Sequence, residues 1–196
     1  MTPEIRAFEF ALGIFSVLIG LAIADVATSL HRLIRHRGTV RWDPLTLLAA
    51  AFALLMSIGM WFDLWGIRHA SSVRHFLLYL ALVATFFVLF LIAASSLPDE
   101  AEGAVDLRVF YQENRRYFWS LVTVFQVLYV AFGLYFTASV FEQLPRAVLV
   151  LLSLQWSLLM AVPVLLSLVR ARALHYAGLA LLLAIDLWHY SRYAIN

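Results

Sequence analysis

The chain has 196 residues, of which 64% are hydrophobic and only 13% are charged. This apolar fraction is far above that of an ordinary soluble domain, so the composition predicts an integral membrane protein. All 14 basic residues are arginines and 12 residues are acidic, and the net charge of +2 is too small to suggest nucleic-acid binding. The absence of cysteine excludes disulfides, thiolate metal sites and thiol redox chemistry.

Six apolar stretches are long enough to cross the hydrocarbon core of a bilayer, which needs about 20 residues. They cover residues 8–30, 45–66, 76–97, 117–141, 147–169 and 174–190. The first stretch follows a start without the basic region or cleavage site of a secretory signal, so we expect it to remain as a helix. None shows the two-residue alternation of barrel strands. We therefore expect an all-α fold, with a single six-helix transmembrane domain over residues 1–196.

The distribution of arginine predicts the orientation of the helices. Nine of the 14 arginines fall around the first, third and fifth connections, and positive charge favours the cytoplasmic side. Both termini are then extracytoplasmic, and the protein is a multi-pass protein of a bacterial inner membrane. The longest loop, at about residues 98–116, lies in the cytoplasm and is expected to hold a short interfacial helix.

Small residues suggest which helix faces meet. Ser16, Gly20, Ala24 and Thr28 recur every four residues in the first stretch, a pattern typical of close packing between membrane helices. Asp25 lies beside this stripe, so we expect its carboxylate to point into protein. The third stretch is almost wholly Leu, Phe, Val and Ala, which places it on the lipid side.

Carboxylates within the apolar stretches are the main candidates for a functional site. At about 1.5 Å per helical residue, Asp25 and Asp186 differ in depth by roughly 10 Å. They are too far apart for a direct pair, but together with Gln126, Gln155 and water they form candidate steps of an ion or proton pathway.

The tripeptide Asp-Leu-Trp occurs twice, beginning at Asp63 and at Asp186. Both copies are predicted near the outer ends of their helices, where two carboxylates at one level can share a proton or bind a cation. His189 lies on the same helical face as Asp186, and Glu9 is predicted at the same rim. Glu9 and His189 are thus candidates for the outer mouth of the pathway.

Each of these residues also has a structural interpretation. Asp25 can be hydrogen-bonded by Thr28 or Ser29, or paired with an arginine at the inner rim, and Asp63 can be hydrated at the interface. A metal site built from Asp63, Asp186 and His189 remains an alternative. Haem ligation is disfavoured because all six histidines lie near helix ends.

Catalysis is disfavoured as well. Asp63 and Asp186 lack the glycine-rich context of an intramembrane aspartyl protease, and the helix with Ser153 and Ser157 contains no histidine base. We therefore expect no enzyme activity, no catalytic residues, no metal and no cofactor.

Three segments carry a resemblance to a known group of proteins. IGLAIADVATSLHRLIRHR at residues 19–37, VRWD at 40–43 and DLRVFYQENRRYFW at 106–119 resemble a widespread family of uncharacterised bacterial inner-membrane proteins. The resemblance implies a bacterial source and six helices, and no activity. The size is also similar to small tetrameric potassium channels, but Ala11 and Leu12 stand where those channels have Ser-Asp, so their function is not carried over.

Two functions are compatible with these features. The first is a channel or transporter for protons or small cations, or a subunit of one, acting as a homo-oligomer through its intramembrane carboxylates. The alternative is a non-catalytic membrane scaffold or accessory subunit that binds a partner protein or anionic lipid.

Overall fold

The computed structural model describes residues 3–66, 76–99, 103–141 and 146–191, and the side chains of residues 3–11, 65–66, 136–141, 146–149, 151–155 and 158 lie outside this description. The chain forms six helices: α1 (Pro3–Arg35), α2 (Pro44–Gly66), α3 (Phe76–Ala94), α4 (Leu107–Phe141), α5 (Arg146–Leu168) and α6 (Arg172–Tyr190). The predicted all-helical fold is therefore confirmed, with each helix on one of the six apolar stretches.

Among the residues that the structure describes, four segments are long and apolar enough to cross a membrane: Leu12–Arg35, Pro44–Leu64, Phe76–Ala94 and Leu107–Tyr135. A fifth apolar segment, Leu159–Leu168, is shorter. These segments belong to α1, α2, α3, α4 and α5.

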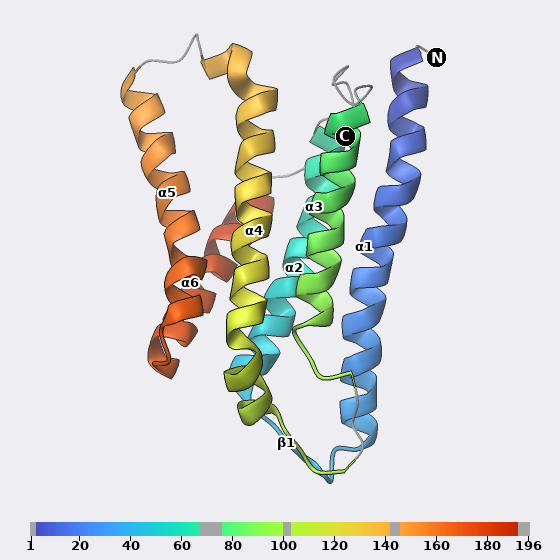
Figure 1. The fold of residues 1–196 in the computed structure, drawn as a ribbon, viewed down its shortest axis with the longest axis vertical. Helices are drawn as coiled ribbons and strands as arrows, with labels where there is room; N and C mark the ends of the chain where they lie inside the picture. The colour runs from blue at the N-terminus through green and yellow to red at the C-terminus, as the bar shows by residue number, and fades with distance from the viewer. Residues whose placement is uncertain (1–2, 67–75, 100–102, 142–145, 192–196) are drawn as a thin grey trace.

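The helices form two layers (Figure 1). One layer contains α1, α3, α4 and α5 in that order across the view, and each helix packs against the next. In the other layer α2 and α6 pack against each other, and α2 also contacts α1, α3 and α4. The chain thus leaves the first layer after α1, returns with α3 and leaves it again with α6.

The connections at one end of the bundle are held by a two-residue parallel sheet. β1 (Val40–Arg41) precedes α2, β2 (Val105–Asp106) precedes α4, and Val40 pairs with Val105. Arg41 reinforces this pairing through an ion pair of 3.1 Å with Asp106. This end also carries most of the arginines of the three connections α1–α2, α3–α4 and α5–α6, and we refer to it as the arginine-rich end.

Aspartate begins both helices that follow these strands. At α2, Asp43 accepts hydrogen bonds from the backbone N–H and the hydroxyl of Thr46, and Pro44 occupies the first helical position. At α4, Asp106 accepts hydrogen bonds from the N–H groups of Arg108 and Val109 at 2.9 and 3.2 Å. Each carboxylate satisfies N–H groups that have no partner within the helix and faces the positive end of the helix dipole.

The pKa of Asp106 lies below its ordinary value. Desolvation alone would raise this pKa, but the N–H groups of Val109 and Arg108 and the guanidinium of Arg41 all favour the ionised form and lower it. The charged carboxylate is thus the form that begins α4.

Helix α4 begins earlier than expected. It is continuous from Leu107 to Phe141, so the short helix predicted within residues 98–116 is the first part of α4 and not a separate element. Leu107 and Tyr111 are buried, which ties this first part to the core of the bundle.

The buried face of α1 is not the stripe of small residues. Buried positions alternate in steps of four and three along one face, at Phe15, Ile19, Ala22, Val26, Ser29 and Leu33. Gly20, Ala24 and Thr28 are exposed, and a Cβ atom added to Gly20 would meet nothing within 4 Å. Gly20, Ala24 and Thr28 therefore do not form the contact between α1 and α3 in the described part of the chain, because larger apolar side chains fill it.

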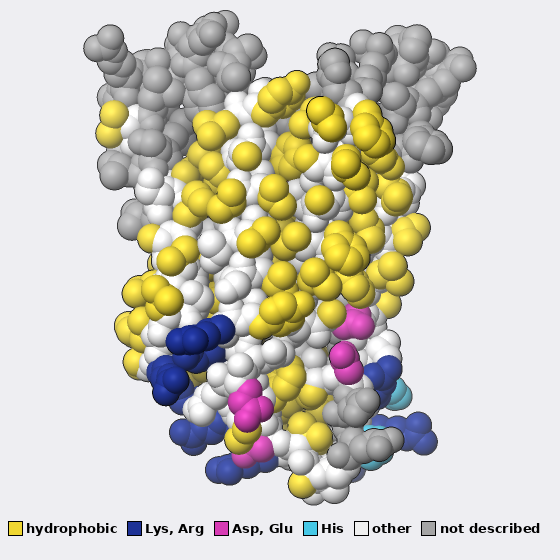
Figure 2. All heavy atoms as spheres, viewed as in Figure 1, with side chains coloured by type: hydrophobic (Ala, Val, Ile, Leu, Met, Phe, Trp, Pro, Cys, Tyr) yellow, Lys and Arg dark blue, Asp and Glu magenta, His cyan; other side chains and the backbone are white. Residues whose placement is uncertain are grey.

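Helix α3 has one packed face and one exposed apolar face. It contacts α1, α2 and α4, with buried side chains including Phe86, Leu89 and Ile92. Phe76, Leu77, Leu80 and Phe87 are exposed, so this second face is compatible with the predicted position on the lipid side. Figure 2 shows apolar side chains over most of one face of the molecule and charged side chains gathered at the arginine-rich end.

Candidate functional site

An acidic cluster joins α2, α4 and α6 near the end opposite the arginine-rich end. The Asp63 carboxylate on α2 accepts hydrogen bonds from the hydroxyls of Tyr129 on α4, at 3.1 Å, and Tyr190 on α6, at 2.9 Å. Its other oxygen lies 3.7 Å from His189 Nε2, within range of an ion pair when the imidazole is protonated. The side chain of Asp63 is 14% exposed, so these neighbours replace most of its water.

A close helix approach makes this arrangement possible. Gly59 lies one turn before Asp63 on α2, and a Cβ atom at Gly59 would overlap the ring of Tyr190. The missing side chain lets the Tyr190 ring rest on the α2 backbone with its hydroxyl directed at Asp63. Gly59 is therefore a positioning residue for the cluster.

Asp186 is the second carboxylate of the cluster. It lies one turn before Tyr190 on α6, is partly buried, and interacts electrostatically with both Asp63 and His189. Within the described residues it forms no hydrogen bond or ion pair. The cluster thus combines one carboxylate that accepts two hydrogen bonds with a second carboxylate that accepts none among the described residues, and the two interact electrostatically.

Gln126 lies about one turn before Tyr129 on α4. It precedes Tyr129 by three residues on α4, so the two side chains share a helical face. Its Oε1 atom is buried without a hydrogen-bond partner in the described part of the chain. A buried acceptor of this kind is costly unless a water or proton donor reaches it.

Asp25 occupies a different place. It is partly buried at the edge of the packed face of α1 and interacts with the charges of Asp99 and Arg32. Neither Thr28 nor Ser29 hydrogen-bonds to it, and Arg32 donates instead to the carbonyl oxygen of Asp99. Asp25 interacts with charges at the arginine-rich end, whereas Asp186 interacts with Asp63 and His189 near the opposite end, so the two carboxylates lie apart.

The remaining two candidates lie outside the described side chains. Glu9 is on α1 and Gln155 is on α5, and the backbone of each is helical. The structure thus brings together Asp63, Asp186 and His189 and separates Asp25 from them.

A buried ion pair that was not predicted from the sequence lies at the arginine-rich end. Arg172 at the start of α6 donates to Asp43 across 2.5 Å, and the Thr46 hydroxyl bonded to Asp43 also donates to the Leu107 carbonyl. The Asp43 side chain is 6% exposed, so the pair is largely out of water. The guanidinium also lies 5.9 Å from the centre of the Tyr176 ring.

A second buried network links α4 to α6. Trp119 Nε1 donates to the Tyr111 hydroxyl at 3.1 Å, and that hydroxyl lies 2.8 Å from His175 Nδ1. His175 Nε2 lies 3.0 Å from the Val169 carbonyl, which can only accept, so Nε2 carries the proton and Nδ1 accepts from Tyr111. Trp119 Nε1, the Tyr111 hydroxyl and both ring nitrogens of His175 thus all have partners when His175 is neutral.

Arg115 completes this end of the bundle. Although its guanidinium is buried, it donates to the carbonyls of Val169 and Ser167 at the end of α5, at 2.6 and 3.3 Å. A cation at a helix C-terminus stabilises the exposed carbonyl oxygens there. Aspartate followed by proline is typical of a helix start, so the role of Asp43 at the start of α2 can be recognised in the sequence. The partners of Asp43 and Arg115 are distant in sequence, and no local pattern indicates them.

The described residues contain no group of three or more His, Cys, Asp or Glu side chains arranged to hold a metal ion. No protein family, curated protein or solved structure matches the chain in comparisons of its sequence and fold.

Proposed function

We propose that the protein spans a bacterial inner membrane with six helices and moves protons or small cations across it, with Asp63 and Asp186 as the carboxylates that take up and release the ion. The observation that carries this proposal is the acidic cluster. Asp63 and Asp186 sense each other's charge, and Asp186 has no hydrogen bond or ion pair among the described residues. A carboxylate inside a membrane costs a few kcal/mol unless it is paired or hydrated, so the residues that remain there by default indicate a functional site.

The composition of the cluster favours protons over larger ions. Tyr129 and Tyr190 both donate to Asp63, and His189 lies within ion-pair distance of it. These groups, together with Asp186, exchange protons readily through hydrogen bonds and water, whereas they offer few fixed oxygen ligands for a metal cation.

The packing below the cluster favours a gated route over an open pore. Val122 and Phe125 on α4 are buried between the cluster and the network of Trp119, Tyr111 and His175. Because Gln126 and Trp119 are seven residues apart, the gap along α4 is about 10 Å. A proton that crosses the bundle by this route therefore needs these side chains to move.

Proton flux into liposomes tests the proposal. We expect the reconstituted protein to acidify vesicles under a potassium-diffusion potential, and Asp186→Asn to lower this flux about tenfold or more because the variant cannot release a proton. Glu113→Gln, which removes an exposed carboxylate on α4, is the matched control and should conduct like the parent. Flux equal to protein-free vesicles, or unchanged flux in Asp186→Asn, would overturn the proposal.

A scaffold or accessory subunit is the second candidate, and the exposed stripe on α1 favours it. Gly13, Gly20, Ala24 and Thr28 lie exposed on α1, and Cβ atoms added to the two glycines would meet no neighbour. Small residues let membrane helices approach closely, so this stripe is suited to a helix of another chain, including a second copy. Gly20→Leu should then lower the mass of the detergent-solubilised assembly measured by light scattering, and an unchanged mass would count against this role.

A further inference from the structure

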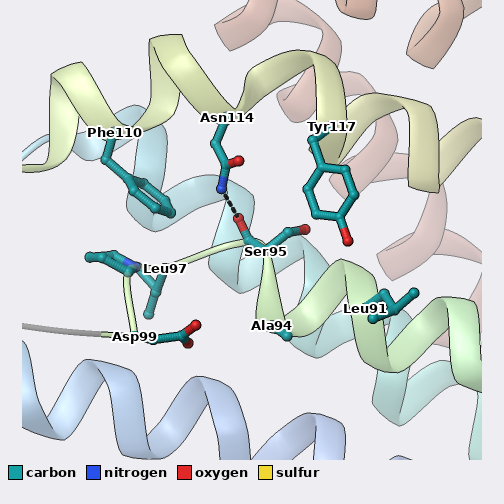
Figure 3. A pocket seen from close by; sticks show the side chains of 9 residues that line it. Leu91, Ala94, Ser95, Leu97, Asp99, Phe110, Asn114 and Tyr117 are labelled. Atoms are coloured by element: carbon teal, nitrogen blue, oxygen red, sulfur yellow. Dashed lines mark hydrogen bonds between the residues drawn. The ribbon is translucent and has the colours of Figure 1, made fainter.

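A hollow of about 220 Å³ lies at the arginine-rich end, between the end of α3 and the first turns of α4 (Figure 3). Leu91, Ala94, Leu97, Pro98 and Phe110 supply apolar walls, and Ser95, Asp99, Asn114 and Tyr117 supply polar atoms. The Asn114 amide donates to the Ser95 carbonyl at 3.3 Å, which fixes the turn after α3 against α4. The hollow is therefore amphipathic and framed by packed elements.

Charges gather at the side of the hollow that faces α1. Asp99 is exposed at the rim, and Arg32 from α1 donates to the Asp99 carbonyl oxygen. Asp25, two turns before Arg32 on α1, interacts with the charges of both residues. Two carboxylates and one guanidinium thus interact electrostatically on the α1 side of this amphipathic hollow, so a ligand with a cation and an anion a few bonds apart fits this rim best.

The position and size of the hollow narrow the class of ligand further. It begins where the apolar segment Phe76–Ala94 ends, the level at which lipid headgroups lie if α3 crosses the membrane. Its volume equals that of about seven water molecules, enough for a headgroup and too small for a complete lipid. Acyl chains would continue over the apolar outer surface of the bundle.

We propose that this hollow binds the headgroup of an aminophospholipid of the phosphatidylethanolamine type. The ammonium group lies beside Asp99 and Asp25, the phosphate accepts hydrogen bonds from Arg32, and the glycerol region packs against Phe110 and Leu91. Phosphatidylglycerol lacks the cation, and the bulky trimethylammonium of phosphatidylcholine has no N–H to donate. The site is separate from the acidic cluster and does not depend on the proposed transport.

Native mass spectrometry of the full chain in detergent tests this proposal with short-chain phosphatidylethanolamine, phosphatidylglycerol and phosphatidylcholine of equal chain length. We expect phosphatidylethanolamine to bind about tenfold more tightly than the other two lipids, the effect of one charge-assisted hydrogen bond. Asp99→Asn should remove this preference, whereas Arg32→Gln should weaken binding of all three lipids. Glu113→Gln, on α4 but outside the lining, should change neither.

Ala94→Phe provides a second test because it fills the hollow without altering a charge. Binding of phosphatidylethanolamine should then be lost while thermal unfolding stays close to that of the parent protein. Equal binding of the three lipids by the parent, an unchanged preference in Asp99→Asn, or full binding by Ala94→Phe would each overturn the proposal. Equally tight binding of water-soluble phosphoethanolamine would overturn the assignment to a lipid.

Discussion

Asp43 and Asp186 differ in how the structure stabilises their charge. Asp43 receives hydrogen bonds from Arg172 and twice from Thr46, and its side chain is almost fully buried. Asp186 is partly buried and has only the charges of Asp63 and His189 near it. A buried carboxylate with all its partners holds helices together, whereas one without them is available to bind a proton or ion.

Breaking the Asp43–Arg172 pair should have the largest effect on stability. Arg172→Met leaves the Asp43 carboxylate buried without its counter-ion, and we expect the free energy of unfolding to fall by about 3–5 kcal/mol. Unfolding in mixed detergent micelles, followed by tryptophan fluorescence, measures this loss. The double variant Asp43→Asn with Arg172→Met should recover most of it, and a loss below about 1 kcal/mol in the single variant would contradict a structural role.

Disrupting the hydrogen-bond network of Tyr111 should cause the second largest loss of stability. Tyr111→Phe leaves Trp119 Nε1–H without an acceptor and His175 Nδ1 without a donor, which should cost about 1–3 kcal/mol in the same unfolding measurement. Tyr117→Phe removes a hydroxyl from an exposed side chain on the same helix and should change stability by less than about 0.5 kcal/mol. Equal effects of the two variants would show that the buried network contributes little.

Gly59→Ala tests the acidic cluster with a smaller change in stability. The added methyl pushes the Tyr190 ring away from α2, so we expect a loss of about 1 kcal/mol, because this ring lies near the end of α6 and can shift. Gly20→Ala adds the same methyl where no atom lies within 4 Å and should stabilise the helix by about 0.5–1 kcal/mol. Effects of the same sign in the two variants would argue against the close approach of Tyr190 to α2.

Replacing Asp106 should have the smallest effect on stability, and this effect should depend on pH. Its pKa is lower in the folded protein than in the unfolded chain, so its stabilising contribution is complete above the unfolded value of about 3.9 and is lost as the pH falls through the folded value. The midpoint of thermal unfolding should therefore decrease less between neutral pH and pH about 3 in Asp106→Asn than in the parent. Parallel pH profiles would contradict this coupling.

The sequence predicted the helices well and their packing poorly. Long apolar runs located all six helices because membrane-length segments carry a strong signal. The sequence did not identify the buried face of α1. Small residues such as Gly20 and Ala24 allow close packing with any helix, and the local sequence does not indicate whether that helix belongs to the same chain. The heptad-like spacing of Phe15, Ile19, Ala22 and Val26 was the more informative pattern.

The candidate site was predicted in part. The repeated Asp-Leu-Trp placed Asp63 and Asp186 at one level, and His189 lies close to both. Tyr190 was missed because a tyrosine near a helix end resembles an interfacial anchor. Tyr129 lies inside α4, and nothing local in the sequence indicates that its hydroxyl has a partner on α2. Arg172 was taken as a loop charge, since its partner Asp43 is distant in sequence and only the fold brings the two together.

The small parallel sheet has a consequence for how the chain assembles. Val40 pairs with Val105 across a long stretch of chain that includes α2 and α3. Closing so long a loop for two residue pairs gains little by itself, so we expect the pairing to form after α1, α2 and α3 have packed. A chain in which α2 or α3 is misplaced would then lack the pairing of β1 with β2.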